Sequence, residues 1–112
     1  MNDDTQKKLL ESVKELLEVD DINDYDNKIS LIIKSEAIKL LNLNVDLNDD
    51  IVPMYLFHIA MPIMDELSSS TLSSYQNLAN SELLLLRDKY AYTAEVSKNE
   101  EANKWKVETR LP

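Results

Sequence analysis

The chain has 112 residues, enough for one domain with a single hydrophobic core. It contains no cysteine and no glycine, which excludes disulfides, thiolate zinc sites and glycine-rich phosphate loops, and fits a reducing, intracellular setting. Its net charge is -9, from 12 basic and 21 acidic residues. That balance argues against a protein that holds nucleic acid by its phosphates.

Asp3 or Asp4 is expected to cap the first predicted helix, which ends near Glu18. The acidic start of the chain also lacks the basic and apolar parts of a secretory signal, so we expect a cytosolic protein. Apolar residues recur every three or four positions, as on one face of an amphipathic helix. They are Leu9, Leu10, Val13, Leu16 and Leu17.

The second predicted helix begins at Asn23 or Asp24, with aspartates near its positive end, and closes near Asn42. Asn42 and Asn44 both suit the left-handed position that often ends a helix, since no glycine is present for it. The apolar positions have helical spacing. They are Tyr25, Ile29, Ile32, Ile33, Ala37, Leu40 and Leu41.

The third predicted helix begins at Asp50 or Ile51, and residues 51–64 are almost entirely apolar. Pro53 is tolerated in a first turn, whereas Pro62 should kink or end the helix. The run is shorter than the roughly 20 residues that span a bilayer, so no membrane segment is expected. Either this helix lies centrally among the others, or one side of it contacts another protein molecule.

A serine-rich connector is expected over residues 68–74, followed by a fourth helix to about residue 92. Its apolar positions again recur every three or four residues, and the four leucines of 83–86 cover more than one core face requires. The fold class predicted from these patterns is all-α, a four-helix domain over residues 1–92 with a C-terminal arm.

Residues 93–112 form that arm, in which apolar residues are isolated among charged ones. We expect the arm to become ordered on a partner. Trp105 either packs back onto the core of its own domain or anchors the arm in a pocket of the partner. The candidate partner-binding residues are Lys104, Trp105, Lys106, Arg110 and Leu111.

No catalytic residue is predicted. His58 is the only histidine, and its apolar surroundings favour a hydrogen-bonded core or interface histidine over a general base. The aspartates Asp20, Asp21, Asp24 and Asp26 are explained by helix capping and solvation rather than by a divalent cation. We therefore expect neither an enzyme nor a cofactor.

One segment imitates the start of a calcium-binding loop. Asp46, Asn48 and Asp50 match its first three ligands. The match stops at Ile51, where glycine is required, and at Phe57, where glutamate is required. No metal site is therefore predicted.

The order of elements resembles the phage head-tail connector (adaptor) proteins, over residues 5 to about 92. The likeness rests on a first helix that ends in an acidic turn (9–21, LLESVKELLEVDD) and a second that opens with Asp and Tyr and closes in Leu-Leu-Asn (23–42). An Asp/Asn-rich loop, an apolar helix entered at Val52-Pro53, a serine-rich bend and the helix over 78–87 follow.

The resemblance implies a helical subunit repeated around the portal axis, as a ring of twelve, which joins the portal to tail and head-completion proteins in the neck of the virion. Such a protein is present in the host cytoplasm during assembly, and DNA passes through its channel without specific binding. The expected subunit-interface residues are Met54, Phe57, Met61, Leu84 and Leu85. The expected channel-facing acidic residues are Asp20, Asp21 and Asp24.

Two other functions fit the same composition. A small acidic inhibitor that mimics DNA and occupies the basic groove of a nucleic-acid enzyme would also carry a charge of -9. A helical regulatory protein that binds by placing a helix in a groove is the third candidate. The acidic mimic predicts binding that collapses with salt, whereas the connector predicts salt-tolerant apolar contacts.

Overall fold

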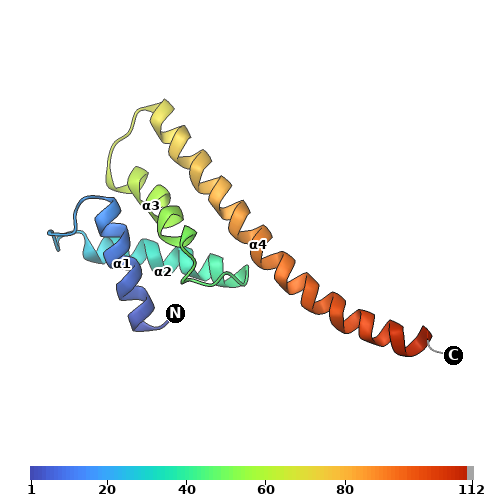
Figure 1. Ribbon diagram of the computed structural model, residues 1–112. Coiled ribbons are helices and arrows are strands. Elements are labelled where there is room, and N and C mark those ends of the chain that lie inside the picture. The colour runs from blue at the N-terminus through green and yellow to red at the C-terminus, as the bar shows by residue number, and fades with distance from the viewer. Residues whose placement is uncertain (111–112) are drawn as a thin grey trace.

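The computed structural model describes the backbone of residues 1–110 and the side chains of residues 1–91. Within this range the chain forms four helices and no strand, which confirms the all-α prediction. The helices are α1 (Asp3–Leu16), α2 (Asp26–Asn42), α3 (Ile51–Met64) and α4 (Ser69–Arg110). Figure 1 shows α3 between the long α4 on one side and the crossing pair α1 and α2 on the other.

Helix α3 is the centre of the core, because α1, α2 and α4 all pack against it. Of the two arrangements open for this apolar helix, the structure shows the central one. On α3 the large apolar side chains that reach 40% exposure or more are Met54 and Ile63. The side chains that are less than 2% exposed come from all four helices. The largest are Tyr55, Ile29, Ile33, Leu40, Leu56, Leu86, Val13 and Val52.

Helices α1 and α2 end in the same way without a glycine. Glu18 (φ 61°) and Asn44 (φ 62°) both take the left-handed conformation. The N–H of the next residue then donates to the carbonyl five positions back. Val19 donates to Lys14 at 2.9 Å, and Val45 donates to Leu40 at 3.0 Å. This is the Schellman pattern. The prediction of Asn44 as a helix terminator is confirmed, and α1 ends two residues earlier than expected.

Glu18 and Asn44 should respond differently to substitution by glycine. A left-handed residue with a Cβ carries a steric cost that glycine lacks, and asparagine bears this cost better than glutamate does. We expect Glu18→Gly to raise the free energy of unfolding by about 0.5–1 kcal/mol, and Asn44→Gly to raise it less. Urea unfolding followed by circular dichroism measures both, and a destabilised Glu18→Gly protein would contradict the expectation.

Three other helix boundaries differ from the sequence prediction. The cap of α1 is Asn2, whose side chain accepts the N–H of Thr5 at 2.7 Å. Helix α2 begins at Asp26 rather than at residue 23 or 24. The connector predicted over 68–74 is wrong after Ser68, because the Ser68 hydroxyl accepts the N–H of Thr71 at 3.3 Å and starts α4 there.

Pro62 was expected to kink or end α3, and the helix ends two residues after it. It lies inside α3, and the helix ends at Met64. The last turn is closed by the N–H of Asp65, which donates to the carbonyl of Met61 at 3.0 Å. Pro62 cannot donate a bond of this kind, and the helix therefore ends within its next turn.

Two polar pairs fix α2 against its neighbours. Lys14 of α1 is buried, and its Nζ lies 2.7 Å from a carboxylate oxygen of Asp26 at the start of α2. The buried Tyr55 of α3 donates its hydroxyl hydrogen bond to Glu36 of α2 at 2.9 Å. Burial, together with that bond to a carboxylate, raises the pKa of Tyr55 above its ordinary value. Tyr55 therefore stays protonated and serves as a donor.

The predicted boundary at residue 92 falls inside α4, which runs from Ser69 to Arg110. The expectation that residues 93–112 become ordered on a partner concerns side chains outside those that the structure describes.

Candidate protein interaction site

Helix α2 presents an apolar stripe to solvent in addition to its buried face. Leu31 is 67% exposed and Ile38 is 65% exposed, and Leu41 continues the stripe. The 31-to-38 spacing of seven residues places these two side chains on one side of the helix. The apolar face predicted for this helix omitted Leu31 and Ile38, although their seven-residue spacing was a signal, and it wrongly included Leu41, which is 45% exposed.

A shallow groove of about 230 Å³ runs between this side of α2 and helix α3. Five of the six residues that line it are apolar or uncharged. They are Leu31, Ile32, Ser35, Glu36, Ile59 and Ile63. Because Glu36 is already bonded to Tyr55 and Lys39, the exposed floor of the groove is mainly aliphatic.

A second groove, of about 440 Å³, continues from the first across α3 to α4. The two grooves share Ile59 and Ile63. On the α4 side the lining is polar but uncharged, with Gln76, Asn77 and Asn80. Residues 67–81 contain no charged side chain. Depletion of charge is typical of the central part of a protein interface, so the two grooves together form one candidate docking surface.

His58 lies at the edge of this second groove and is buried, as predicted for a core or interface histidine. Its Nδ1 lies 2.5 Å from a carboxylate oxygen of Glu82 on α4. The rings of Phe57 and Tyr75 pack beside it, at centroid distances of 5.2 and 5.6 Å. His58 therefore links α3 to α4 within the chain.

Helix α4 carries three different sides, each marked by a pair of residues seven positions apart. Ala79 and Leu86 are buried against α3. The Asn77 side, which lines the second groove, also carries Leu84. The third side carries Leu78 and Leu85, which are 48% and 59% exposed. Since successive helical residues turn by about 100°, Leu78 and Leu85 form a ridge that faces away from the groove.

The five expected interface residues are separated by the structure into two groups. Leu84 and Leu85 are exposed on different sides of α4, and Met54 is exposed on α3. Phe57 and Met61 are only partly exposed, because Phe57 packs against Tyr75 and Met61 lines a pocket within the chain. The groove and the ridge are thus better placed to contact another molecule than the outer part of α3.

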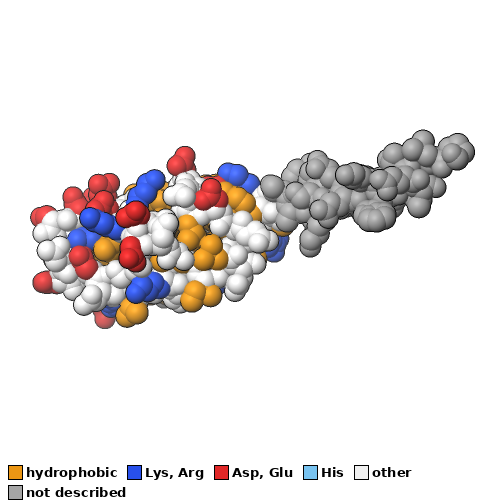
Figure 2. Space-filling model, turned by 90° about the horizontal axis from the view of Figure 1, so that it is seen from below, with side chains coloured by type: hydrophobic (Ala, Val, Ile, Leu, Met, Phe, Trp, Pro, Cys, Tyr) orange, Lys and Arg blue, Asp and Glu red, His pale blue; other side chains and the backbone are white. Residues whose placement is uncertain are grey.

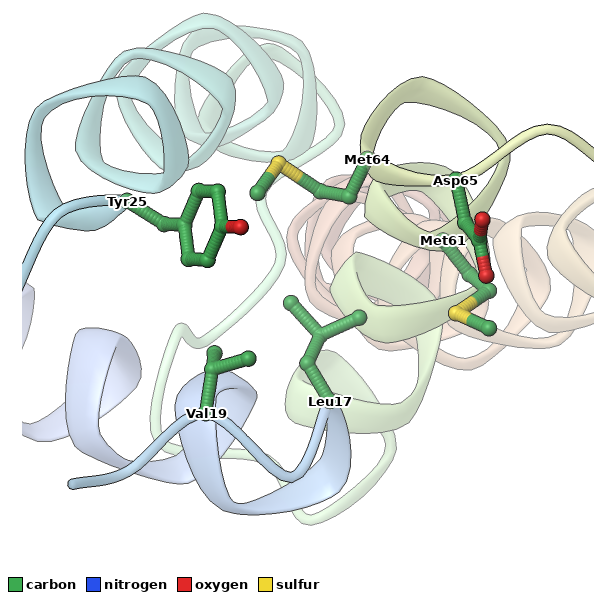
Figure 3. Close-up of a pocket in the computed structure, with 6 residues that line it drawn as sticks. All are labelled: Leu17, Val19, Tyr25, Met61, Met64 and Asp65. Carbon is green, nitrogen blue, oxygen red and sulfur yellow. The ribbon is translucent and has the colours of Figure 1, made fainter. Parts of the chain in front are cut away.

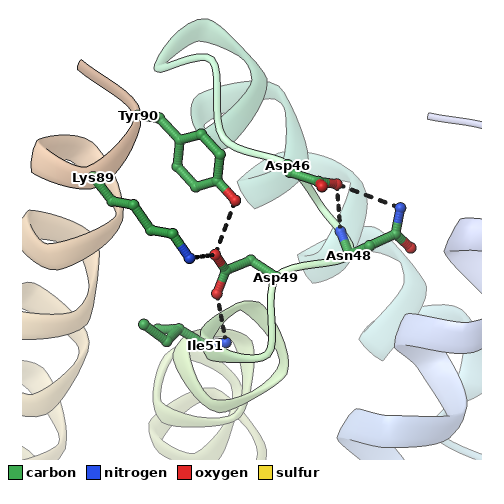
Figure 4. A network of polar contacts seen from close by, with 6 residues as sticks. All are labelled: Asp46, Asn48, Asp49, Ile51, Lys89 and Tyr90. Atoms are coloured by element: carbon green, nitrogen blue, oxygen red, sulfur yellow. Dashed lines mark hydrogen bonds and ion pairs between the residues drawn. The ribbon is translucent and has the colours of Figure 1, made fainter. Parts of the chain in front are cut away.

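The loop before α3 is held to α4 by one carboxylate. Asp49 is 5% exposed at its side chain and accepts from Lys89 Nζ at 2.6 Å, from the Tyr90 hydroxyl at 2.8 Å and from the N–H of Ile51 at 3.0 Å (Figure 4). The bond from Lys89 in particular holds the pKa of Asp49 below its ordinary value. The bond to Asp49 raises the pKa of Lys89. Desolvation by burial raises the pKa of Tyr90.

The segment that resembles the start of a calcium-binding loop forms hydrogen bonds within the chain. Asp46 accepts hydrogen bonds from the backbone N–H and the side-chain amide of Asn48, at 2.9 and 3.4 Å. The carboxylate of Asp49 points toward α4 (Figure 4). In the part of the chain that the structure describes, no group of three or more His, Asp or Glu side chains is placed to hold a metal ion.

The three expected channel-facing aspartates, Asp20, Asp21 and Asp24, are all exposed in the loop between α1 and α2. Figure 2 shows acidic side chains gathered at this end of the molecule and apolar patches in its middle. Exposed acidic side chains are therefore concentrated at the end that holds the loop between α1 and α2.

Beside this acidic loop lies a pocket of about 260 Å³ between the end of α1 and the end of α3. Figure 3 shows the side chains of Tyr25, Val19, Leu17 and Met64 around its open centre, with Asp65 at one edge. Tyr25 was expected on the apolar face of the second helix. Instead it precedes the helix and is largely exposed.

The expected partner-binding residues Lys104, Trp105, Lys106, Arg110 and Leu111 lie outside the side chains that the structure describes. Among residues 1–110, no helix combines the length and apolar character needed to cross a membrane.

No family model matches the chain, and neither the curated proteins nor the solved structures contain a match to it. The function is therefore argued from the surfaces described above.

Proposed function

We propose that this protein is a non-enzymatic head-tail connector of a phage particle, which forms a ring beneath the portal and joins the head to the tail. The observation that carries the proposal is the pair of exposed apolar surfaces on one chain. One is the groove bordered by Leu31 and Ile63, and the other is the ridge of Leu78 and Leu85 on α4.

A groove and a ridge on different sides of a subunit favour a head-to-tail contact. Each copy then uses its ridge on one neighbour and its groove on the other, and such heterologous contacts close into a ring when the rotation allows. A self-complementary dimer would use one surface twice and would leave the other surface in water. The two surfaces therefore support a ring better than a dimer.

The charge distribution supports the same proposal. The net charge is -9, and the loop with Asp20, Asp21 and Asp24 places exposed carboxylates at one end of the molecule. A channel wall with negative charge repels the phosphates of passing DNA and so does not bind them. The two grooves and the ridge of Leu78 and Leu85 lie apart from this loop.

The rival proposal, an acidic mimic of DNA, requires carboxylates spaced along a long face. The longest helix has few of them: between Ser69 and Ala91, α4 carries two acidic residues, Glu82 and Asp88. Glu82 is occupied by His58, and Asp88 by Arg87. The described surface of α4 therefore offers the connector proposal more support than the mimic.

Light scattering coupled to size exclusion tests the proposal, with the purified protein alone and mixed with the portal protein encoded in the same genome. We expect a complex with the portal that contains many copies of this chain and persists at 0.5 M salt, about three times physiological ionic strength. A ring that forms only on the portal also satisfies the proposal. A strict monomer that ignores the portal, or a genome without a portal gene, would contradict it.

A further inference from the structure

The pocket between α1 and α3 is lined by residues suited to an aromatic side chain. Met61 and Met64 contribute two thioethers, and Leu17, Val19 and Tyr25 complete the apolar wall (Figure 3). Methionine adapts its shape to an inserted group and makes favourable contacts with aromatic rings. The volume of about 260 Å³ corresponds to about nine water molecules, which is the scale of one large side chain.

The rim of this pocket is acidic. Residues 18–26 contain five acidic residues and no basic one. Of these, Asp26 is paired with Lys14, whereas Asp20, Asp21 and Asp24 are exposed. Asp65 adds a further carboxylate at the edge of the pocket. A ligand that fits both the wall and the rim combines an aromatic group with flanking positive charges.

The chain itself contains a segment with that chemistry. Trp105 is its only tryptophan, and it lies between Lys104 and Lys106. Residues 104–112 contain three basic residues and one acidic residue. Tryptophan is also a typical anchor at the centre of a protein interface.

Helix geometry indicates that the segment comes from a second copy. The pocket reaches Asp65, four residues before α4 begins, and α4 then continues as one helix to Arg110. Residue 105 is 36 positions after Ser69, which is about 54 Å along a helix with a rise of 1.5 Å per residue. A copy therefore holds its own Trp105 far from its own pocket.

We propose that the pocket of Leu17, Val19, Tyr25, Met61, Met64 and Asp65 binds Trp105 of a neighbouring copy, with Lys104 and Lys106 against the acidic loop of residues 18–26. The inference rests on the proposed function, since it names a contact that links successive subunits of the ring. It is also head-to-tail, because one end of each copy enters the other end of the next. Asp21 and Asp24 would then lie beside a subunit contact.

The single tryptophan makes the contact directly measurable in the full-length protein. Its emission should shift to shorter wavelength as the protein concentration rises, because Trp105 leaves water for the pocket. The shift should occur with or without portal. If the emission is shifted at every concentration, the tryptophan packs within its own chain, and the proposal is overturned.

Charge variants identify the rim as the docking site. Asp21→Lys with Asp24→Lys should weaken self-association at least tenfold, because the rim would then repel the lysines beside Trp105. The control is Glu11→Lys with Glu15→Lys, two exposed positions on α1 with the same change of charge, and it should change association less than twofold. Adding Lys104→Glu and Lys106→Glu to the rim variant should restore association. Equal effects of rim and control variants would overturn the proposal.

The outcome separates this inference from the proposed function. Portal-bound rings in which Trp105 emission remains that of an exposed indole would overturn the pocket contact and leave the connector function standing. Concentration-dependent burial of Trp105 in a protein that ignores the portal would support the contact and contradict the connector. A monomer with an exposed tryptophan at all concentrations, both alone and mixed with the portal protein, would overturn both.

Discussion

Asp49→Asn is expected to lower the free energy of unfolding by about 1–2 kcal/mol at pH 7, since a buried carboxylate that accepts hydrogen bonds from Tyr90 and from the N–H of Ile51 is replaced by an amide. The salt bridge to Lys89 contributes less than its short distance suggests, because Lys89 is 59% exposed and such pairs are screened by solvent. Urea unfolding followed by circular dichroism measures the difference.

The same variant has a predicted pH dependence. The pKa of Asp49 is lowered in the folded chain from an ordinary value of 3.8, mainly by the bond from Lys89. A carboxyl group with a lowered pKa contributes its stability above the unfolded value and loses it as the pH falls through the folded value. The stability difference between the natural protein and Asp49→Asn should therefore be complete at pH 7 and shrink as the pH falls below about 4.

Asp50→Asn is the matched control for this substitution. Asp50 is the next residue, it is exposed, and its side chain makes no capping hydrogen bond to α3. The charge change is identical, so a general effect of net charge would appear in both variants. We expect Asp50→Asn to change stability by less than about 0.5 kcal/mol. Equal losses in the two variants would show that Asp49 does not hold the loop to α4.

The second large effect is expected on assembly. Ile38→Glu places a charge in the exposed apolar stripe of α2, at a position that is 65% exposed and so contributes little to the fold. Burial of an isoleucine side chain in an interface is worth about 1.5–3 kcal/mol, and loss of that burial corresponds to roughly ten- to hundredfold weaker association. Analytical ultracentrifugation measures the change. Asn48→Glu, at an exposed loop position outside the stripe, is the control of equal charge.

A mixing experiment then distinguishes a ring contact from a symmetric dimer. Leu85→Glu should damage the ridge of α4 and leave the groove intact, whereas Leu31→Glu, at a 67% exposed residue that lines the groove, should do the reverse. In a head-to-tail assembly, each mixed pair retains one undamaged contact, so the mixture should form heterodimers and no ring. Two variants that also fail to associate when mixed would contradict the pairing of groove with ridge.

The sequence predicted that α3 is covered on most of its surface, and it left open whether the other helices or another protein molecule cover it. A helix without a polar face can satisfy its apolar side chains only by being covered on most of its surface, and residues 51–64 contain two titratable groups, Tyr55 and His58. The burial of that histidine followed from the same argument. Which acidic residue pairs with it was not predictable, since Glu82 lies 24 positions away on another helix.

The buried face of α2 could not be predicted fully from the spacing of its apolar residues. Its buried residues Ile29, Ile33 and Leu40 and its exposed residues Leu31 and Ile38 are chemically alike. Both sets have helical spacing, and the sequence does not say which set faces α1 and α3. The interface residues expected from the sequence therefore lie on the third and fourth helices, whereas the structure adds an exposed apolar stripe on the second.

Asp49 was not distinguished by the sequence for a related reason. It is one of several acidic residues in an Asp/Asn-rich loop, and it has the same local propensities as Asp46 and Asp50. Its role appears only when the fold brings Lys89 and Tyr90, forty residues later in the chain, within hydrogen-bond distance.

The sequence by itself determined that this chain is helical, that a left-handed helix end falls at Asn42 or Asn44, and that residues 51–64 must be covered on most of their surface. These features depend on periodicity and capping within a few residues, and so the local sequence determines them. Only the tertiary structure decided which apolar stripe of α2 is covered, which aspartate ties the loop to α4 and which side chains of α1 and α3 enclose a pocket. Each of these depends on the distance between segments far apart in the chain, which local preferences do not encode.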